Sequence, residues 1–539
     1  MKKSKKVTLT LISGLLLGLS FPPLPFFLLA FIGFIPLLFL LIKENDLKHK
    51  YFYIYLTFFI YHASTNWWIG SWRQESDPYL TASAIALAIV HPFFFMIPFA
   101  AFLYIKRKVN SFIALNIFPF LWTSFEWLHS LGEFSYPWLT IGNTQIYNSH
   151  WVQFIDITGV WGASLLIAVV NVIILNIILN YRNNRHTTFK SLVIENKLHF
   201  ISLLVIIALP VIYSFYSLNK WNNAVNSANT IKVGIIQPAV NPWQKWDMSV
   251  DDQILMQMKL QDSLKKAVPD IDLMIWSETS IPRHINLSEK FDYQFLQYWA
   301  DKNKTSLMTG FAEIQIFKEE NASATARYFR NDSSMMYESY NSAMLLNPGK
   351  ENITSYRKMR LTPLAERLPY ADYLLFMRSW FEWGVGISAW GIGREQKNLI
   401  YDKEKKIHIA PIICIESVYP DFVRNFSAMG AGIFTVITND AWYDYTPGPR
   451  QHYLIAAMRA IENRRAVARC ANTGISGVLL PTGKSLGEIP QYERTASSWN
   501  VPILTEKTLY TILGDWAAQL SLILSLIFLI FGKYIIKKV

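Results

Sequence analysis

The sequence predicts an α-helical membrane domain of about eight transmembrane helices, joined to an extracytoplasmic α/β domain. Long apolar stretches occupy residues 7–218 and 510–532, whereas residues 231–505 have the mixed composition of a soluble domain. Apolar residues make up 52% of the 539-residue chain and charged residues only 17%. The basic residues also gather in alternate loops between the apolar stretches.

Eight apolar segments approach the roughly 20 residues that a helix needs to cross a bilayer. The first follows the charged start MKKSKK, as in a signal peptide, but FPPLP and a second apolar segment come next in place of a cleavage site. We therefore favour an uncleaved first span with a Pro-rich hairpin to the second. The segments are 7–21, 24–42, 51–70, 79–105, 111–130, 158–180, 199–218 and 510–532.

Loop charges predict the orientation of these spans. If the N-terminus lies inside, the inner segments contain seventeen Lys and Arg residues and the short outer loops contain only Arg73. Cytoplasmic loops carry such an excess, so both termini are predicted to be cytoplasmic and the soluble domain extracytoplasmic. This bias accounts for part of the net charge of +12, and no basic stripe suited to nucleic acid is present. The seventeen are Lys2, Lys3, Lys5, Lys6, Lys43, Lys48, Lys50, Lys106, Arg107, Lys108, Arg182, Arg185, Lys190, Lys197, Lys533, Lys537 and Lys538.

The predicted domains are a seven-helix membrane domain over 1–220, a soluble domain over 231–505 and a final transmembrane helix over 510–532. In the soluble domain, β-branched runs alternate with segments of helical periodicity, which is typical of a layered α/β fold. Strands are predicted at 231–238, 271–278, 305–314, 406–416, 430–440 and 474–483, helices at 251–268, 291–303 and 450–470, and a hairpin over 340–363.

Three polar residues end or closely follow apolar strands: Glu278, Lys358 and Cys414. Each has an ordinary alternative, because Glu278 could cap a helix, Lys358 could be a solvated hairpin lysine and Cys414 a small core residue. Cys414 could also pair with Cys470, the only other cysteine, although both follow strand-like runs and not loops.

Together, these three residues form a coherent set for nucleophilic catalysis. Active sites of α/β folds gather at strand ends. A carboxylate can take the proton of a thiol, and a lysine beside the thiol lowers its pKa and can stabilise an oxyanion. The sequence therefore predicts Cys414 as a nucleophile with Glu278 and Lys358 as partners.

The segments WSETSIP, YRKMRLTPLAERLP and CIESVYPDFVR resemble the three catalytic segments of the nitrilase (carbon–nitrogen hydrolase) superfamily. The resemblance implies an αββα sandwich with a Glu-Lys-Cys triad. Seven spans upstream and one downstream make the chain similar to the membrane-embedded branch of that superfamily, the apolipoprotein N-acyltransferases.

By that resemblance, Glu278 is the proton acceptor, Lys358 stabilises the oxyanion and thiolate, and Cys414 is the nucleophile. Glu366 and Glu416 match supporting carboxylates, and Trp246 matches a loop tryptophan near the acyl chain. The family often has Tyr after the nucleophile, whereas this chain has Ile415, so local packing or an oxyanion contact differs there.

The resemblance implies a two-step acyl transfer in the bacterial inner membrane, the last step of lipoprotein maturation. A phospholipid donates its acyl group to the cysteine, and the resulting thioester passes it to the N-terminal diacylglyceryl-cysteine of an apolipoprotein. No cofactor or metal is implied, and no metal-binding spacing or P-loop occurs in the sequence.

The segment 370–393 is unusually aromatic and contains Trp383 and Trp390. It is either a buried core segment or a membrane-facing arm with Trp at the interface and hinges at its glycines, including Gly391 and Gly393. Under the second interpretation the two tryptophans contact substrate.

Two other functions share parts of this pattern. A membrane-tethered nitrilase-type amidase would use the same triad but has no need of eight spans. A transporter with a non-catalytic outer domain would more commonly show intramembrane charges and repeats, whereas the spans here hold few charges (Glu126 is one) and no convincing repeat.

Overall fold

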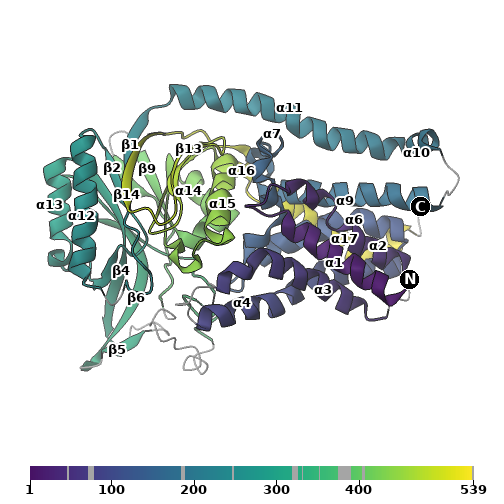
Figure 1. Ribbon diagram of the computed structural model, residues 1–539, viewed down its shortest axis with the longest axis horizontal. Coiled ribbons are helices and arrows are strands. Elements are labelled where there is room, and N and C mark those ends of the chain that lie inside the picture. The colour runs from purple at the N-terminus through teal and green to yellow at the C-terminus, as the bar shows by residue number, and fades with distance from the viewer. Residues whose placement is uncertain are drawn as a thin grey trace.

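The computed structural model has two parts, a helical domain and an α/β domain (Figure 1). Both chain termini lie in the helical domain at the end remote from the α/β domain. The structure describes residues 1–44, 48–70, 78–183, 188–245, 248–318, 326–329, 332–350, 353–363, 365–373, 390–402 and 407–536.

All eight predicted apolar segments are helical over most of their described length. The long helices form a bundle in which α1 packs on α3, α6 packs on both α5 and α9, and α17 packs on α6. The helices are α1 (Lys3–Leu19), η1 (Phe27–Phe31), α2 (Ile35–Lys43), α3 (Lys50–Asn66), η2 (Trp67–Gly70), α4 (Pro78–Val90), α5 (Pro92–Lys108), α6 (Ser111–His129), η3 (Pro137–Leu139), η4 (Ile141–Tyr147), α7 (Ser149–Val152), α8 (Ile155–Thr158), α9 (Val160–Asn183), α10 (Phe189–Glu195), α11 (Lys197–Ser227), α16 (Leu509–Leu513) and α17 (Trp516–Ile536).

The predicted single helix over 79–105 is two helices, α4 and α5. Pro92 is the first residue of α5, and a proline has no N–H to continue the hydrogen bonding of the preceding helix. Together, α4 and α5 still form one continuous apolar stretch, Leu80–Lys108.

Three stretches among the described residues are long and apolar enough to cross a membrane: Leu80–Lys108, Val160–Arg182 and Lys197–Ser227. The third, within α11, exposes most of its apolar side chains, including Leu204 and Ile212. A soluble surface rarely exposes so large an apolar patch, so this surface is suited to lipid.

The α/β domain contains two sheets: the first takes strands β1–β7 and the last strand β14, and the second takes the consecutive strands β8–β13. The first has the order β14-β1-β2-β4-β6-β5, with β3 beside β4 and β7 beside β6; the second has the order β13-β12-β11-β10-β9-β8. The strands are β1 (Thr230–Gln237), β2 (Leu273–Trp276), β3 (Ile281–Ile285), β4 (Ser306–Lys318), β5 (Arg327–Phe329), β6 (Asp332–Leu346), β7 (Thr354–Arg357), β8 (Leu399–Asp402), β9 (Ile407–Ile413), β10 (Ile433–Thr438), β11 (Ala466–Ala471), β12 (Ser476–Leu479), β13 (Ser485–Ile489) and β14 (Thr495–Pro502).

The two sheets pack face to face between two layers of helices, which confirms the predicted αββα sandwich. Helices α12 (Val250–Ala267) and α13 (Gln294–Asn303) cover the first sheet, while α14 (Pro420–Ala428) and α15 (Pro447–Asn463) lie between the second sheet and the helical domain (Figure 1). Cys470 on β11 is fully buried between the sheets, where its Sγ lies 3.2 Å from the Ile236 carbonyl oxygen of β1. Both cysteines are free, so the disulfide alternative is wrong.

The predicted helix over 450–470 is too long. Helix α15 ends at Asn463, because Arg464 adopts a left-handed conformation (φ 51°) and turns the chain. The following residues form β11, which pairs in parallel with β10 in the centre of the second sheet. Its alternating Ala, Val and Cys side chains suit a strand that is buried on both faces.

Helix α15 is buried on all sides and joins the two domains through hydrogen bonds. Gln451 accepts from Trp138 Nε1 (2.8 Å) and donates to the Pro22 carbonyl oxygen (2.7 Å). At its other end, Arg464 Nη2 lies 2.7 Å from Asp156 Oδ2 of α8. The nucleophile segment that contacts α15 is therefore held from the helical side as well.

Candidate active site

Glu278 follows β2 in a tight turn on the first sheet. The next residue, Thr279, has a left-handed conformation (φ 44°), and the turn lies directly against Gly310 of β4. A Cβ at Gly310 would lie 2.8 Å from the Glu278 Cα and 2.6 Å from the Thr279 nitrogen, so only glycine fits there. Buried Lys245 completes the turn by donating to Thr279 Oγ1 (2.8 Å) and to the Glu278 carbonyl oxygen (3.3 Å).

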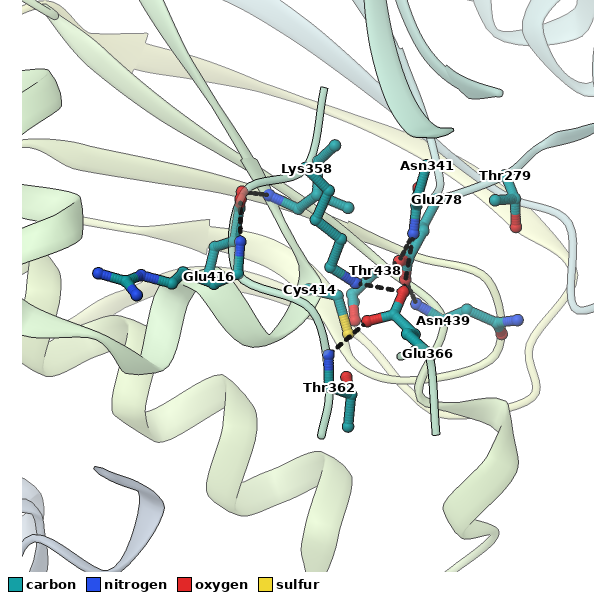
Figure 2. A network of polar contacts seen from close by, with 12 residues as sticks. Glu278, Thr279, Asn341, Lys358, Thr362, Glu366, Cys414, Glu416, Thr438 and Asn439 are labelled. Carbon is teal, nitrogen blue, oxygen red and sulfur yellow. Dashed lines mark hydrogen bonds and ion pairs between the residues drawn. The ribbon is translucent and has the colours of Figure 1, made fainter. Parts of the chain in front are cut away.

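Lys358 follows β7, the second strand of the hairpin that the sequence predicts. Pairing of β6 with β7 places its backbone beside β6, where Lys358 N donates to the Asn341 carbonyl oxygen (2.8 Å). Its Nζ donates to Glu278 Oε1 (3.0 Å) and Glu366 Oε1 (2.9 Å). Figure 2 shows this lysine between the two carboxylates and next to Cys414.

The two carboxylates are also fixed by other donors. Asn341 Nδ2 bridges them, at 2.7 Å from Glu278 Oε1 and 3.1 Å from Glu366 Oε1. The Asn439 N–H donates to Glu278 Oε2 (2.9 Å), and the Thr362 N–H donates to Glu366 Oε2 (2.8 Å). Each oxygen therefore has a defined partner, as Figure 2 shows.

Electrostatics keep the lysine charged. Burial by itself would lower the pKa of Lys358, but the charges of Glu278 and Glu366 outweigh it and raise that pKa well above its ordinary value. Burial likewise acts to raise the pKa of Glu366, and the Lys358 ammonium overcomes it, so that the pKa of Glu366 is lowered. The site thus holds a permanent cation next to the thiol.

Cys414 lies at the end of β9, on the second sheet, and begins the short helix η8 (Cys414–Val418). Its φ of 51° is a left-handed conformation that costs a non-glycine residue about 1–2 kcal/mol. Burial raises the pKa of its thiol, with the Glu278 charge acting in the same direction and the Lys358 charge against it. The thiol is therefore protonated at rest, and a base must take its proton for it to react.

Glu416 is fully buried behind the nucleophile, where it joins Cys414 to the lysine loop. Its Oε1 accepts from Tyr356 Oη (2.6 Å) and from the Met359 N–H (2.7 Å), and its Oε2 accepts from the Ile413 N–H (2.9 Å). Burial raises the pKa of Glu416 to about 7. Through these hydrogen bonds the carboxyl group of Glu416 holds the loop that carries Cys414 against the loop that carries Lys358.

Two family models match this chain. The model described as "Apolipoprotein N-acyltransferase N-terminal domain" matches residues 13–173, and the model described as "Carbon-nitrogen hydrolase" matches residues 232–499. An apolipoprotein N-acyltransferase of Chlorobaculum tepidum is 32% identical over 532 residues, which cover 96% of this chain and 95% of that protein. The chain belongs to the apolipoprotein N-acyltransferase family.

Other similarities are more distant. An apolipoprotein N-acyltransferase of Rickettsia prowazekii is 26% identical over 552 residues, covering 99% of both proteins. The solved structure of Saccharomyces cerevisiae Nit3, a member of branch 10 of the nitrilase superfamily, is 17% identical and covers 51% of this chain and 90% of that one, with a TM-score of 0.37. As a member of the apolipoprotein N-acyltransferase family, the chain is an acyltransferase, and it contains a carbon-nitrogen hydrolase domain.

The structure brings together Glu278, Lys358, Glu366 and Cys414 and places Glu416 behind them. The sequence pattern does not predict Asn341, Asn439 and Lys245 as site residues. Asn341 and Asn439 each stand next to an apolar strand run, as the predicted residues do, but an uncharged amide carries little signal by itself.

The structure describes one of the three tryptophans that are predicted to contact substrate. Trp246 and Trp383 lie outside the described residues. Trp390 is buried, with 8% of its surface exposed, which agrees with the buried alternative given for this segment. Its backbone N–H donates to the Glu366 carbonyl oxygen (3.2 Å), which puts it next to the site.

Of the four predicted hinge glycines, those at 384 and 386 lie outside the described residues, and Gly391 and Gly393 make backbone hydrogen bonds. The Gly391 N–H donates to the Ser339 carbonyl oxygen and the Gly393 N–H to the Lys358 carbonyl oxygen, both at 2.8 Å. A Cβ at Gly393 would lie 2.1 Å from the Arg357 carbonyl oxygen. These glycines allow a close backbone contact, and that contact fixes the lysine segment.

A small hollow with a cavity volume of about 40 Å³, open to solvent on one side, lies beside the lysine segment and between the two domains. The helical domain contributes Gly132, Glu133 and Ser135, and the α/β domain contributes Arg360 and Arg367 among others. The Arg360 guanidinium lies 5.4 Å from the ring centre of Tyr419, which also lines the hollow. In the part of the chain that the structure describes, no group of His, Cys, Asp and Glu side chains is arranged to hold a metal ion.

Proposed function

We propose that this chain N-acylates the N-terminal diacylglyceryl-cysteine of apolipoproteins, using a phospholipid as acyl donor and a thioester on Cys414 as intermediate. The observation that carries the proposal is the pair of ion pairs from Lys358 to Glu278 and Glu366 beside the Cys414 thiol, in a member of this acyltransferase family. Splitting one transfer between two membrane-bound substrates into two steps is the usual advantage of covalent catalysis.

In the first half-reaction, Glu278 takes the thiol proton as Cys414 Sγ attacks the ester carbonyl carbon of the phospholipid. The tetrahedral oxyanion forms next to the Lys358 ammonium, whose charge is permanent and needs no reorientation. When the intermediate collapses, the ester C–O bond breaks, and the lysophospholipid oxygen leaves with the proton from Glu278. The acyl group remains on sulfur as a thioester.

In the second half-reaction, the α-amine of the diacylglyceryl-cysteine attacks the thioester carbonyl carbon. Glu278 takes a proton from the amine while Lys358 again faces the oxyanion. The C–S bond then breaks, and the proton passes from Glu278 to Cys414 Sγ, which regenerates both the thiol and the carboxylate. Glu366 keeps Lys358 in place in both steps, since it binds the same ammonium and is itself fixed by Thr362.

The membrane arrangement that we propose has eight transmembrane helices, both termini in the cytoplasm and the catalytic domain on the periplasmic side of the inner membrane. The seventeen-to-one loop charge bias supports it. The position of both termini at the end of the helical domain remote from the α/β domain also supports it (Figure 1). Division of the chain at 1–220, 231–505 and 510–532 fits this arrangement.

We assign the hollow between the domains to the head group of the phospholipid donor. Arg360 lines it two residues after Lys358, and a guanidinium binds phosphate oxygens with directed hydrogen bonds. Arg360 has no ion-pair partner among the described residues, so its charge is available to a ligand.

A nitrilase-type amidase would share the triad but is not favoured, because the relative from Chlorobaculum tepidum matches 96% of this chain, the helical domain included. Intact-protein mass spectrometry after incubation with phospholipid tests the proposal. We expect a mass increase of one acyl chain, lost in Cys414→Ala, and its release on addition of a diacylglyceryl-cysteine peptide. An unmodified enzyme that hydrolyses small amides would contradict it.

A further inference from the structure

A second polar cluster lies against the backbone of the nucleophile. It consists of Ser417, Asp440, His452 and Arg469, all of them at most 2% exposed. These residues come from η8, from η9 (Asp440–Tyr443), from α15 and from β11. The reaction described above uses none of them.

The cluster is a continuous chain of contacts that ends on the backbone of Cys414. Arg469 Nη2 donates to Asp440 Oδ2 (2.5 Å), and Asp440 Oδ1 lies 2.9 Å from His452 Nδ1. On the other side of the ring, His452 Nε2 lies 3.1 Å from the Cys414 carbonyl oxygen. Ser417 Oγ donates to the same carbonyl oxygen (2.8 Å). Arg469 Nη2 also lies 3.0 Å from His452 Nδ1, and a guanidinium can only donate, so Nδ1 accepts from it. The hydrogen of the neutral imidazole is then on Nε2, which donates to the Cys414 carbonyl oxygen.

The helical domain completes the cluster. The indole ring of Trp138 packs on the imidazole of His452 with the ring centres 5.3 Å apart. Trp138 is itself fixed by its hydrogen bond to Gln451. Polar groups of Asp440, Arg469, Ser417 and Cys414 therefore surround the two ring nitrogens, and an indole from the helical domain packs on the ring.

These contacts determine the direction of one peptide group. In a trans peptide the C=O and N–H point in opposite directions. With the Cys414 carbonyl directed at His452 and Ser417, the Ile415 N–H points the opposite way, away from those two side chains. As the second residue of a short helix, Ile415 has no intrahelical acceptor for this N–H, which leaves it available to an oxyanion.

Ser417, His452 and Asp440 also have the order of contacts of a serine hydrolase triad, since Ser417 Oγ lies 2.9 Å from His452 Nε2. Ser417 is not a nucleophile here, because it is only 1% exposed and its hydroxyl is engaged with the Cys414 carbonyl oxygen. The cluster acts on the cysteine backbone and not on a second substrate.

We infer that His452 is a positioning residue for acyl transfer, which holds the Cys414–Ile415 peptide so that its N–H faces the oxyanion of the thioester-forming step. This inference rests on the proposed function. The Cys414 backbone is strained, because it has a left-handed conformation. The hydrogen bonds to its carbonyl oxygen offset this strain.

Two substitutions test the contacts of the two imidazole nitrogens one at a time. In His452→Gln the amide nitrogen takes the place of Nε2 and can still donate to the Cys414 carbonyl oxygen. In His452→Asn the shorter amide reaches Asp440 but not Cys414. We expect thioester formation from phospholipid to slow about 100-fold in His452→Asn, the size of effect seen when an oxyanion donor is lost, and less than about threefold in His452→Gln.

Alkylation of Cys414 by iodoacetamide is the matched control, because displacement at a saturated carbon forms no oxyanion. Both variants are expected to alkylate within about threefold of the wild-type rate. Equal thioester rates in the two variants, or a loss of alkylation parallel to the loss of thioester in His452→Asn, would overturn the inference.

If His452→Asn does not fold, Ser417→Ala provides the test, since it removes the other donor to the same carbonyl oxygen. It is expected to slow thioester formation about tenfold with alkylation unchanged. A wild-type thioester rate in Ser417→Ala would then contradict the inference. A wild-type enzyme that forms no thioester on Cys414 would refute the proposed function instead, so the two failures are distinct.

Discussion

Lys358 Nζ and Glu278 Oε1 lie 3.0 Å apart, although 80 positions separate these residues in the chain. Glu278 follows β2 and Lys358 follows β7, and these two strands do not pair with each other. Strands β4 and β6 stand between β2 and β7 and bring the two residues to one edge of the first sheet. Cys414 comes to the same place from the second sheet. The candidate site therefore exists only when both sheets are packed together.

The first prediction concerns the nucleophile. Cys414→Ala should abolish both acyl-enzyme formation and lipoprotein N-acylation, whereas Cys470→Ala should retain both, because Cys470 is buried between the sheets. Intact mass and a gel-shift assay of lipoprotein measure the two activities. Loss of activity in Cys470→Ala with a folded protein, and its retention in Cys414→Ala, would reverse the assignment.

The second prediction concerns the charged partners. Glu278→Gln and Lys358→Ala should each slow lysophospholipid release about 10²–10⁴-fold, since each removes a general base or an oxyanion-stabilising cation. Arg357→Gln is a matched control, because Arg357 is adjacent to Lys358 but pairs with Glu313. Normal lysophospholipid release in Glu278→Gln or Lys358→Ala would remove that residue from the mechanism.

The third prediction uses the buried carboxyl group of Glu416. Burial raises its pKa from an ordinary 4.5 to about 7, so the folded state holds a proton that the unfolded state releases. The stabilisation is complete below pH 4.5 and is lost as pH rises through about 7, at most about 3 kcal/mol over that window.

Glu416→Gln should therefore show a flatter dependence of unfolding free energy on pH between 4.5 and 7 than the wild type. Thermal unfolding in detergent at several pH values measures it. Parallel curves for the two proteins would mean that Glu416 does not titrate in this window.

The fourth prediction concerns the hollow between the domains. Arg360→Ala should raise the KM for phospholipid about tenfold or more with little change in kcat, because Arg360 lines the head-group site but does not touch the reacting atoms. Lys397→Ala removes a cation that is already paired with Glu395 on the surface and serves as the control. An unchanged KM in Arg360→Ala would place the head group elsewhere.

The fifth prediction concerns topology. A reporter fused after Lys538 should read cytoplasmic, and one inserted near Asn321 should read periplasmic, as the loop charges indicate. If both reporters lay on the same side of the membrane, the predicted number of transmembrane helices between them would be wrong by an odd number.

Site residues could be predicted from the sequence where a polar residue ends or closely follows an apolar strand. Glu278, Lys358 and Cys414 stand out for that reason, and the structure places them together. Asn341 does not stand out, because its role depends on the pairing of β6 with β4 and β7, which no local pattern encodes.

Long-range pairing also explains the errors in the fold. Strand β14 pairs with β1 from Thr230↔Pro502 onward, and its polar sequence TASSWNVP gives no apolar alternation to detect. The helical pattern over 450–470 continues past the true end of α15, because a left-handed Arg464 has none of the usual helix-ending signals of glycine or proline. At Trp390, burial within the chain prevailed over the preference of tryptophan for a membrane interface.

The buried position of α15 has a consequence for exchanging parts between relatives. Its outward face is complementary to the helical domain at Pro22, Trp138 and Asp156, through contacts that leave no room for solvent. A chimaera that takes its catalytic half from one species and its membrane half from another would have to carry both sides of this contact from the same parent. Exchange of either half alone would leave buried hydrogen-bonding groups of α15 without their partners.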